Sequence, residues 1–489
     1  MVSPLVDSLL FLLSYRKSPQ TKGEAMAQGM HLSEQFGRLP NFDGDTEFRL
    51  HRNRQKVVQL VNGQLMANQK SESSGLSSRS IENGLYGFAA RPEWSMGSAE
   101  KVLAQSKANL AVLKSVGSSS SIHYPPSAAK ITTSPLFRKE AWMEAQLLDR
   151  MKGLDAKLEA LGPEIKSRKI ILREQSFEKE VWTGLGGHGQ TNLVRCHIYF
   201  FLTAEGKNGQ VEVMEVFGGR GFVEDIFPTD EVVDFHFSRA YKRLKEKMEG
   251  AYSKPGKHTV ILDPKLAGIL AHEAIGHTTE ADLVKGGSVA GQFLNKKVAS
   301  DLVTLVDFAH SFDGKECPVP VYHDDECIEA SDTMIIENGI LKGFMNSRES
   351  SVEFDQPATG HARAWGFDDE PLIRMRNTAI LPGKDKLEDM ISSVDEGYYL
   401  IDHSNGQADS TSEFMFGVTM GYEIKNGQLG RALLDTTISG VAFDMLKSVS
   451  MISDEMRWVD SGTCGKKQPM YVGMGGPAIK CQITMGGRS

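Results

Sequence analysis

The residues with the clearest chemical potential stand in one stretch, which reads Leu266-Ala-Gly-Ile-Leu-Ala-His-Glu-Ala-Ile-Gly-His277. His272 and His277 are five residues apart, and Glu273 directly follows the first histidine. Two imidazoles and a carboxylate on an apolar helix are the groups that a hydrolytic metal site requires. The alternative interpretation is a pair of partly buried histidines with ordinary backbone partners.

The spacing of the two histidines is unusual for a helical metal site. In the common His-Glu-x-x-His motif the histidines are four residues apart and lie on one helical face. At ~100° per residue, a spacing of five would place the second ring about 140° away from the first. We therefore expect either a break in the helix near Gly276 or a π-bulge, and glycine makes both inexpensive.

A third ligand is also needed, because a catalytic zinc takes three protein ligands and keeps one position open for water. Cys464 is a distant candidate, since the glycines beside it would let its thiolate approach a metal closely; a small residue in a tight turn is the alternative. Spacing alone favours the tight turn for Cys464. The candidates nearer in sequence are Glu280, His310, His323, Asp324 and Glu326.

Composition sets broad limits on the class of protein. A chain of 489 residues is too long for one ordinary core, so we expect two or three domains. A net charge of −8 argues against nucleic acid or an anionic membrane as the main partner. The five cysteines are scattered and contain no Cys-x-x-Cys pair, which favours a reducing cytoplasm over a disulfide framework.

The beginning of the chain does not resemble a secretory signal. Residues 5–13 are apolar, but Asp7 interrupts them and no Lys or Arg precedes them. We expect an N-terminal helix or an extended start here. No other apolar run approaches the length needed to span a membrane.

Asn-Gly pairs between alternating apolar and polar residues predict β-hairpins, because both residues tolerate positive φ. Together with several helical stretches, they favour an α+β fold, in which antiparallel β-sheets and hairpins carry packed helices. Asp263-Pro264 is a helix-start signal just before the histidines. Helices are also predicted over 98–116, with Ser98 as cap, and over 137–161 and 230–250, and a glycine-rich strand pair over 470–487. The six Asn-Gly pairs begin at Asn62, Asn83, Asn208, Asn338, Asn405 and Asn426.

The predicted domain organisation follows composition. Residues 118–128 lie in a serine-rich stretch with two prolines and are expected to form a linker. The segments on either side are an N-terminal α+β domain over 1–117, a central α+β domain over 129–250 and a C-terminal domain over 251–489, which contains the candidate metal-binding residues.

Several motifs together resemble the TldD/PmbA family of zinc metallopeptidases. The resemblance covers nearly all of residues 47–487 and is densest after residue 260. The motifs that carry it are Ala271-His-Glu-Ala-Ile-Gly-His277 with Glu280-Ala-Asp282, Tyr322-His-Asp-Asp-Glu326, Arg374-Met-Arg-Asn-Thr378 with Leu381-Pro-Gly383, Phe416-Gly-Val with Gly421-Tyr-Glu-Ile, and Gly462-Thr-Cys-Gly-Lys466.

The resemblance implies a metallopeptidase with an HExxxH zinc site of the TldD type. It implies that His272, His277 and Cys464 bind Zn2+ and that Glu273 is the catalytic carboxylate. We expect Glu280 or Asp282 to orient the imidazoles, with solvated charges at a helix end as the alternative.

The resemblance also implies substrates and partners. Unfolded or small peptides are the expected substrates, and the expected partner is a zinc-less PmbA/TldE-like paralogue in a heterodimer, or a second copy in a homodimer. The alternative function is a non-catalytic interaction or regulatory protein with a structural zinc site. A DNA-associated role is disfavoured, because the chain is acidic and shows no basic stripe.

Overall fold

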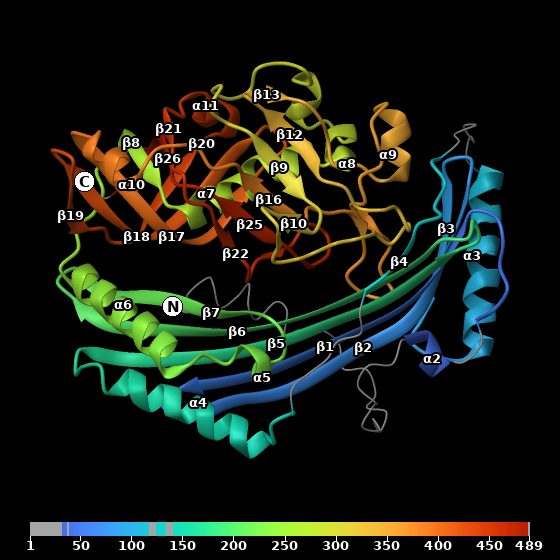
Figure 1. The fold of residues 1–489 in the computed structure, drawn as a ribbon, viewed down its shortest axis with the longest axis horizontal. Coiled ribbons are helices and arrows are strands. Elements are labelled where there is room, and N and C mark those ends of the chain that lie inside the picture. Colours follow the sequence, from blue (N-terminus) through green and yellow to red (C-terminus); the bar gives the residue numbers. More distant parts are fainter. Residues whose placement is uncertain (1–31, 37–38, 117–123, 134–139, 488–489) are drawn as a thin grey trace.

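The structure is a computed structural model that describes residues 32–36, 39–116, 124–133 and 140–487. Its fold is α+β, as predicted: a long curved sheet extends beneath a C-terminal part that is built from two further sheets (Figure 1). The apolar stretch at residues 5–13 and most of the predicted linker lie outside the described residues. In the described part of the chain, no helix combines the length and apolar character needed to cross a membrane.

The long sheet joins strands from two distant segments of the chain. Its order is β3-β2-β1-β5-β6, and β7 and β4 both pair with β6. β1 is antiparallel to β5 along nearly its whole length, so that Phe48 lies opposite Trp182 and Val61 opposite Lys169. The strands are β1 (Thr46–Val61), β2 (Gln64–Glu82), β3 (Leu85–Arg91), β4 (Lys130–Thr132), β5 (Ile165–Thr183), β6 (His188–Gly206) and β7 (Gly209–Arg220).

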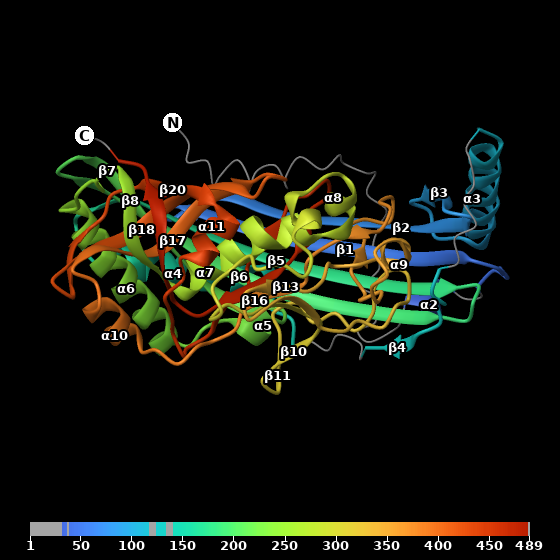
Figure 2. The same cartoon turned by 90° about the horizontal axis from the view of Figure 1, so that it is seen from above.

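The pairing of β1 with β5 connects the first two predicted domains, over 1–117 and 129–250. Both ranges contribute strands to one continuous sheet rather than to two sheets. The long strands run along the length of the molecule when it is seen from above (Figure 2). The boundaries at residues 117, 128 and 250 stay a prediction.

The two faces of the long sheet are chemically different, because successive side chains point to opposite sides of a strand. Apolar residues such as Val58, Leu60, Ile170 and Leu172 are buried beneath two helices on the outer face. Polar residues of the alternate register, such as Arg49 and Lys179, contact the C-terminal part through Asp325. The covering helices are α4 (Glu144–Glu159) and α6 (Asp230–Met248), and α3 (Met96–Val116) packs on β2 and β3.

The C-terminal part contains a sheet that closes on itself. Its order is β17-β8-β26-β20-β18-β19, and β17 also pairs with β18, while β21 pairs with β26. The strands are β8 (Gly256–Leu262), β17 (Glu396–Ala408), β18 (Glu413–Lys425), β19 (Gln428–Ala432), β20 (Thr436–Val441), β21 (Met451–Ile452) and β26 (Ile479–Met485).

A second sheet in the C-terminal part has the order β13-β12-β9-β16-β25-β22. Helix α7 (Pro264–Leu270) packs against β25 of this sheet and against β17 of the closed sheet. The largest buried apolar cluster of the described chain surrounds this helix. The strands are β9 (Leu305–Phe308), β12 (Thr333–Glu337), β13 (Ile340–Leu341), β16 (Asn377–Ile380), β22 (Arg457–Val459) and β25 (Gly473–Gly476).

The remaining elements are short. Two-residue strand pairs are formed by β10 with β11, β14 with β15, and β23 with β24. These strands are β10 (Ser311–Phe312), β11 (Lys315–Glu316), β14 (Ala362–Arg363), β15 (Leu372–Ile373), β23 (Thr463–Cys464) and β24 (Met470–Tyr471). The short helices are α2 (Leu32–Phe36), α5 (Val223–Ile226), α8 (Ala281–Lys285), α9 (Arg348–Glu353), α10 (Leu387–Ser392) and α11 (Ala442–Lys447).

The Asn-Gly prediction holds for five pairs and is wrong for Asn405-Gly406. That pair lies inside β17, where Gly406 is opposite Phe416. A Cβ atom on Gly406 would lie 1.7 Å from the Phe416 ring, so glycine here makes room for an aromatic side chain. The chain turns later, where the Asp409 carboxylate accepts hydrogen bonds from the backbone N–H groups of Thr411 and Glu413.

Two further predictions are corrected by local geometry. Helix α3 begins at Met96, and the hydroxyl of Ser95 accepts a hydrogen bond from Ser98 N, so Ser95 is the capping residue in place of Ser98. The predicted strand pair over 470–487 does not form, because β25 and β26 belong to different sheets. Glycine-rich composition indicated extended chain correctly, but it carries no information about which strand is the neighbour.

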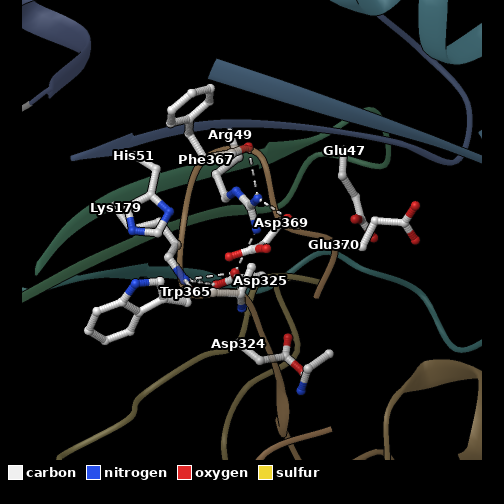
Figure 3. Close-up of polar contacts among 12 residues, drawn as sticks. Glu47, Arg49, His51, Lys179, Asp324, Asp325, Trp365, Phe367, Asp369 and Glu370 are labelled. Carbon is white, nitrogen blue, oxygen red and sulfur yellow. Dashed lines mark hydrogen bonds and ion pairs between the residues drawn. The ribbon is translucent and has the colours of Figure 1, made fainter. Parts of the chain in front are cut away.

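Buried ion pairs join the long sheet to the C-terminal part (Figure 3). The carboxylate of Asp325 accepts hydrogen bonds from Lys179 Nζ at 2.6 and 2.7 Å and from Arg49 Nη1 at 2.9 Å. Arg49 Nη2 also donates to the carbonyl oxygens of Gly366 and Phe367. Burial alone would raise the pKa of the Asp325 carboxyl, but Lys179 and Arg49 outweigh it and hold that pKa below its ordinary value.

We predict that Asp325→Asn destabilises the fold by about 3–5 kcal/mol, because it leaves two buried cations without their anion. Chemical denaturation at neutral pH measures the loss. Since the folded pKa of Asp325 is depressed, its contribution is present above the unfolded carboxyl pKa and is lost as the pH falls through the folded pKa. The control is Asp301→Asn, whose ion pair with Lys297 is exposed, and a loss as large in this variant would contradict the argument.

Candidate metal centre

The helix that carries the histidines begins as its sequence predicts. Asp263 accepts a hydrogen bond from Lys265 N at 3.0 Å, and Pro264 occupies the first helical position. Gly268 lets α7 approach the backbone of β25 closely, since a Cβ atom there would lie 2.9 Å from Gly475 N. The helix is therefore fixed at its start by a cap and along one side by a strand.

A π-helical segment, Ala271–Gly276, follows α7 and carries His272. The backbone N–H of His277 donates to the carbonyl of His272, which is the i to i+5 bond of a π turn. This turn absorbs the extra residue in the spacing, and the two imidazole rings lie 5.1 Å apart between centroids. Of the two expected geometries, the π-bulge is present and the break is not.

Gly276 has a different role from the predicted one. Its φ is −54°, which any residue adopts, so conformational freedom is not what the position needs. A Cβ atom on Gly276 would lie 2.0 Å from the sulfur of Met375. Glycine is present because the side chain of Met375 packs directly on the π turn.

The structure brings Cys464 to the two histidines from β23. Its sulfur lies 3.3 Å from His277 Nε2, and one ligand atom from each of the three residues falls within 4.8 Å of the others. Among the described residues, His272, His277 and Cys464 form the group of side chains that lie close enough together to hold a metal ion. All three side chains come from the third predicted domain.

The other candidates for the third ligand have partners elsewhere. His310 stacks on Tyr322, and His323 Nδ1 lies 2.9 Å from the backbone oxygen of Asp324. The carboxylate of Asp324 accepts hydrogen bonds from backbone N–H groups, and Glu326 pairs with Arg79 from the long sheet. The Tyr322–Glu326 motif therefore joins the two parts of the molecule.

The electrostatics of the three side chains favour metal binding. Burial opposes ionisation of the Cys464 thiol, but His277 and His272 outweigh it and hold the thiol pKa well below its ordinary value. Burial likewise disfavours a charged His277, but Glu280 and Cys464 raise the pKa of its imidazole well above the ordinary value. Both shifts favour the thiolate form of Cys464, which is the form that binds metals.

His272 supplies an independent test of whether a metal fits. The residue is 1% exposed, and neither ring nitrogen has a hydrogen-bond partner in the described part of the chain. Buried polar atoms without partners are costly and call for an explanation, such as a bound ion. Two imidazoles and one thiolate form the N and S donor set that suits zinc, so the residues present fit that metal.

Glu280 contacts one of the candidate ligands, which is the contact that an orienting carboxylate would make. Its buried carboxylate lies 2.7 Å from His277 Nδ1, which leaves Nε2 of the same ring beside Cys464. A carboxylate on the second ring nitrogen fixes the tautomer and the orientation of a metal-binding histidine. Asp282 does not reach an imidazole and pairs with Lys466 instead.

Two cations that sequence reasoning did not single out hold the segment around Cys464. Lys466 Nζ lies 3.2 Å from Glu280 Oε1 and donates to the carbonyl of Ile373 at 2.8 Å. Arg374 is fully buried and donates to the carbonyl of Cys464 at 3.1 Å. Both residues stand in motifs quoted for the family resemblance, but a motif does not show which backbone atoms its cations bind.

Glu273 lies beside the ligands without serving as one. Its Oε2 atom is 3.6 Å from His277 Nε2, and its side chain is 28% exposed. It is thus the carboxylate at this site that combines proximity to the metal-binding atoms with access to solvent. That placement suits a proton acceptor for a water molecule.

Comparisons with known proteins show sequence similarity to metalloproteases. Residues 255–487 match the family model described as the PmbA/TldA metallopeptidase C-terminal domain. A zinc metalloprotease TldD homolog of Saccharolobus solfataricus is 33% identical over 347 residues, which cover 70% of this chain and 76% of that protein. A metalloprotease of Methanocaldococcus jannaschii is 34% identical over 328 residues, which cover 66% and 70%.

Solved structures share the overall fold. A crystal structure from Thermotoga maritima aligns with a TM-score of 0.73 at 17% identity and covers 90% of this chain and 96% of its own. TldE from Thermococcus kodakarensis aligns with a TM-score of 0.69 at 16% identity and covers 93% and 97%. The chain belongs to the TldD/PmbA family of metallopeptidases.

We predict that Glu280→Gln weakens zinc binding by about 10- to 100-fold, because the His277 ring loses its charged partner. Competition with a chelator of known affinity measures the change. The matched control is Asp282→Asn, which removes a carboxylate two residues away that contacts Lys466 and no imidazole. Equal effects of the two substitutions would show that general charge, rather than orientation of the ring, governs binding.

Proposed function

We propose that this protein is a zinc-dependent peptidase that hydrolyses unfolded or small peptides, with Glu273 as the general base. The observation that carries the proposal is the convergence of His272, His277 and Cys464 beside Glu273. The sequence similarity to metalloproteases supports the reaction class. The substrate class rests on the family resemblance of the motifs.

The chain's own residues have separate tasks in this reaction. His272, His277 and Cys464 would hold the zinc, which would supply Lewis acidity and make a nearby water molecule more acidic. Glu273 accepts the proton of the attacking water and passes it to the nitrogen of the leaving amine. Glu280 keeps the His277 ring in place while this happens, since its carboxylate is already bonded to Nδ1.

The number of protein ligands favours a catalytic metal over a structural one. Structural zinc sites are usually closed by four side chains, whereas catalytic sites use three and keep a position for water. In the part of the chain that the structure describes, three side chains meet, and Glu273 is a partly exposed carboxylate next to them. A structural site would not need that carboxylate.

We predict that Glu273→Gln binds zinc as tightly as the wild type but cleaves an unfolded peptide at least about 100-fold more slowly. The substitution keeps the size of the side chain and removes its proton-accepting oxygen. Zinc content by elemental analysis and peptide cleavage by mass spectrometry measure the two properties separately.

Cys464→Ser provides the complementary variant, because it is expected to lose both zinc and cleavage. Full cleavage by Glu273→Gln would contradict the mechanism. X-ray absorption showing a fourth protein ligand to zinc would instead favour the structural site and a non-catalytic regulatory role.

We propose further that the protein works as a dimer in the cytoplasm, with a zinc-less PmbA/TldE-like paralogue as partner. The shared fold with TldE of Thermococcus kodakarensis supports a paralogue of the same architecture. All five cysteines are buried as free thiols, which supports a reducing compartment.

Purification of the protein from its source cell, followed by metal analysis of the complex, tests the partner. A heterodimer with a paralogue that lacks the ligands is expected to contain fewer zinc ions than chains. Equal numbers of zinc ions and chains, with one type of chain present, would show a homodimer instead.

A further inference from the structure

The segment that carries Cys464 has few backbone contacts of its own. Among the described residues, strand β23 pairs with β24 alone, through Thr463 opposite Tyr471 and Cys464 opposite Met470. A zinc–sulfur bond is ~2.3 Å long, so a shift of this short hairpin by about 1 Å would remove the thiolate from the metal. Its position must therefore be fixed by side chains from other elements.

Arg195 of the long sheet reaches this hairpin from outside the C-terminal part. The residue lies in β6, is 2% exposed, and its Nη1 donates to the carbonyls of Gly462 at 2.9 Å and Asp460 at 3.2 Å. Its Nη2 donates to the hydroxyl of Thr463, the residue before Cys464, at 2.9 Å. The guanidinium also lies 3.9 Å above the Tyr471 ring, so it contacts both strands of the hairpin.

Neighbouring residues of the long sheet reinforce these contacts. Gln175 Oε1 accepts a hydrogen bond from Arg195 Nε at 3.4 Å, which uses the remaining side of the guanidinium. His197, two residues further along β6, has Nε2 3.2 Å from Asp460 Oδ1. The sheet thus holds the Asp460–Thr463 segment through several directed contacts.

The chemistry of the guanidinium explains why arginine suits this position. Its five N–H donors have a fixed planar arrangement, and hydrogen bonds from a charged donor are stronger than neutral ones. One arginine can therefore fix two carbonyls and a hydroxyl in a single geometry while its face packs on an aromatic ring. Lysine offers one nitrogen and cannot reproduce this pattern.

We propose that Arg195 is a positioning residue for the metal centre, an inference that rests on the zinc function proposed above. The C-terminal part supplies all three ligands, and the long sheet sets where the third one stands. Binding of zinc by Cys464 thereby depends on docking of the long sheet against the C-terminal part.

The test compares zinc affinity and ligand identity in substituted full-length proteins. Arg195→Lys is expected to weaken zinc binding by about 10-fold or more, as loss of a supporting contact does at other zinc sites. Replacement of zinc by cobalt(II) gives a thiolate charge-transfer absorption that reports on Cys464 alone, and this band is expected to weaken in parallel. Thr463→Val removes a single contact and keeps the buried charge, so a smaller loss in the same direction is expected.

Arg49→Lys is the matched control. Arg49 is 4% exposed and also joins the long sheet to the C-terminal part, through Asp325 and backbone carbonyls, but it does not contact the 460–464 segment. Its substitution is expected to lower stability and to leave zinc affinity and the cobalt band unchanged. A loss of affinity in Arg49→Lys as large as in Arg195→Lys would overturn the proposal, because docking in general would then be responsible.

The outcomes separate this inference from the proposed function. If the wild type binds zinc through Cys464 while Arg195→Lys and Thr463→Val bind it equally well, the positioning role alone is wrong. If Cys464→Ser binds zinc as tightly as the wild type, the metal centre itself is wrong and the inference is overturned with it. Should Arg195→Lys fail to fold, Thr463→Val decides: unchanged affinity overturns the inference, and reduced affinity supports it.

Discussion

One backbone hydrogen bond, from the N–H of His277 to the carbonyl of His272, is the constraint on which the candidate site depends. The two histidines are five residues apart, and in this structure a π turn brings their rings to the same side. The π turn also depends on Gly276, because a Cβ atom at this position would clash with the side chain of Met375. A backbone irregularity and a core contact therefore determine whether two histidines can share an ion.

The third ligand shows a different kind of dependence. Cys464 stands 187 positions after His277 and meets it because the C-terminal strands return to the helix. Three cations surround the segment that contains this cysteine. Arg374 donates to the carbonyl of Cys464, and Lys466 pairs with Glu280. Arg195 donates to the carbonyl of Gly462, two residues before the cysteine. The nitrogen and sulfur donors thus belong to three side chains, but their relative positions depend on contacts from distant parts of the fold.

Local signals in the sequence predicted local structure well. Asn-Gly pairs marked five hairpins, and Asp263-Pro264 marked the start of α7. The histidine spacing indicated either a helix break or a π-bulge, and the structure contains the bulge. Strand neighbours were not predictable, because periodicity shows which residues share a face but not which strand lies alongside. For the same reason the continuity of β1 with β5 and the contacts of Arg195 were missed. The full set of candidate ligands was predicted through family resemblance, since spacing alone did not favour Cys464.

The pairing of β1 with β5 has a consequence for how the chain acquires its structure. Val61 lies opposite Lys169, so the ribosome must add more than a hundred residues after β1 before its partner strand exists. Until then β1 presents an unpaired edge, and closing so long a loop slows folding. A nascent chain of this kind is exposed to association with other unfinished chains, and early capture of that edge by a chaperone would favour the native pairing.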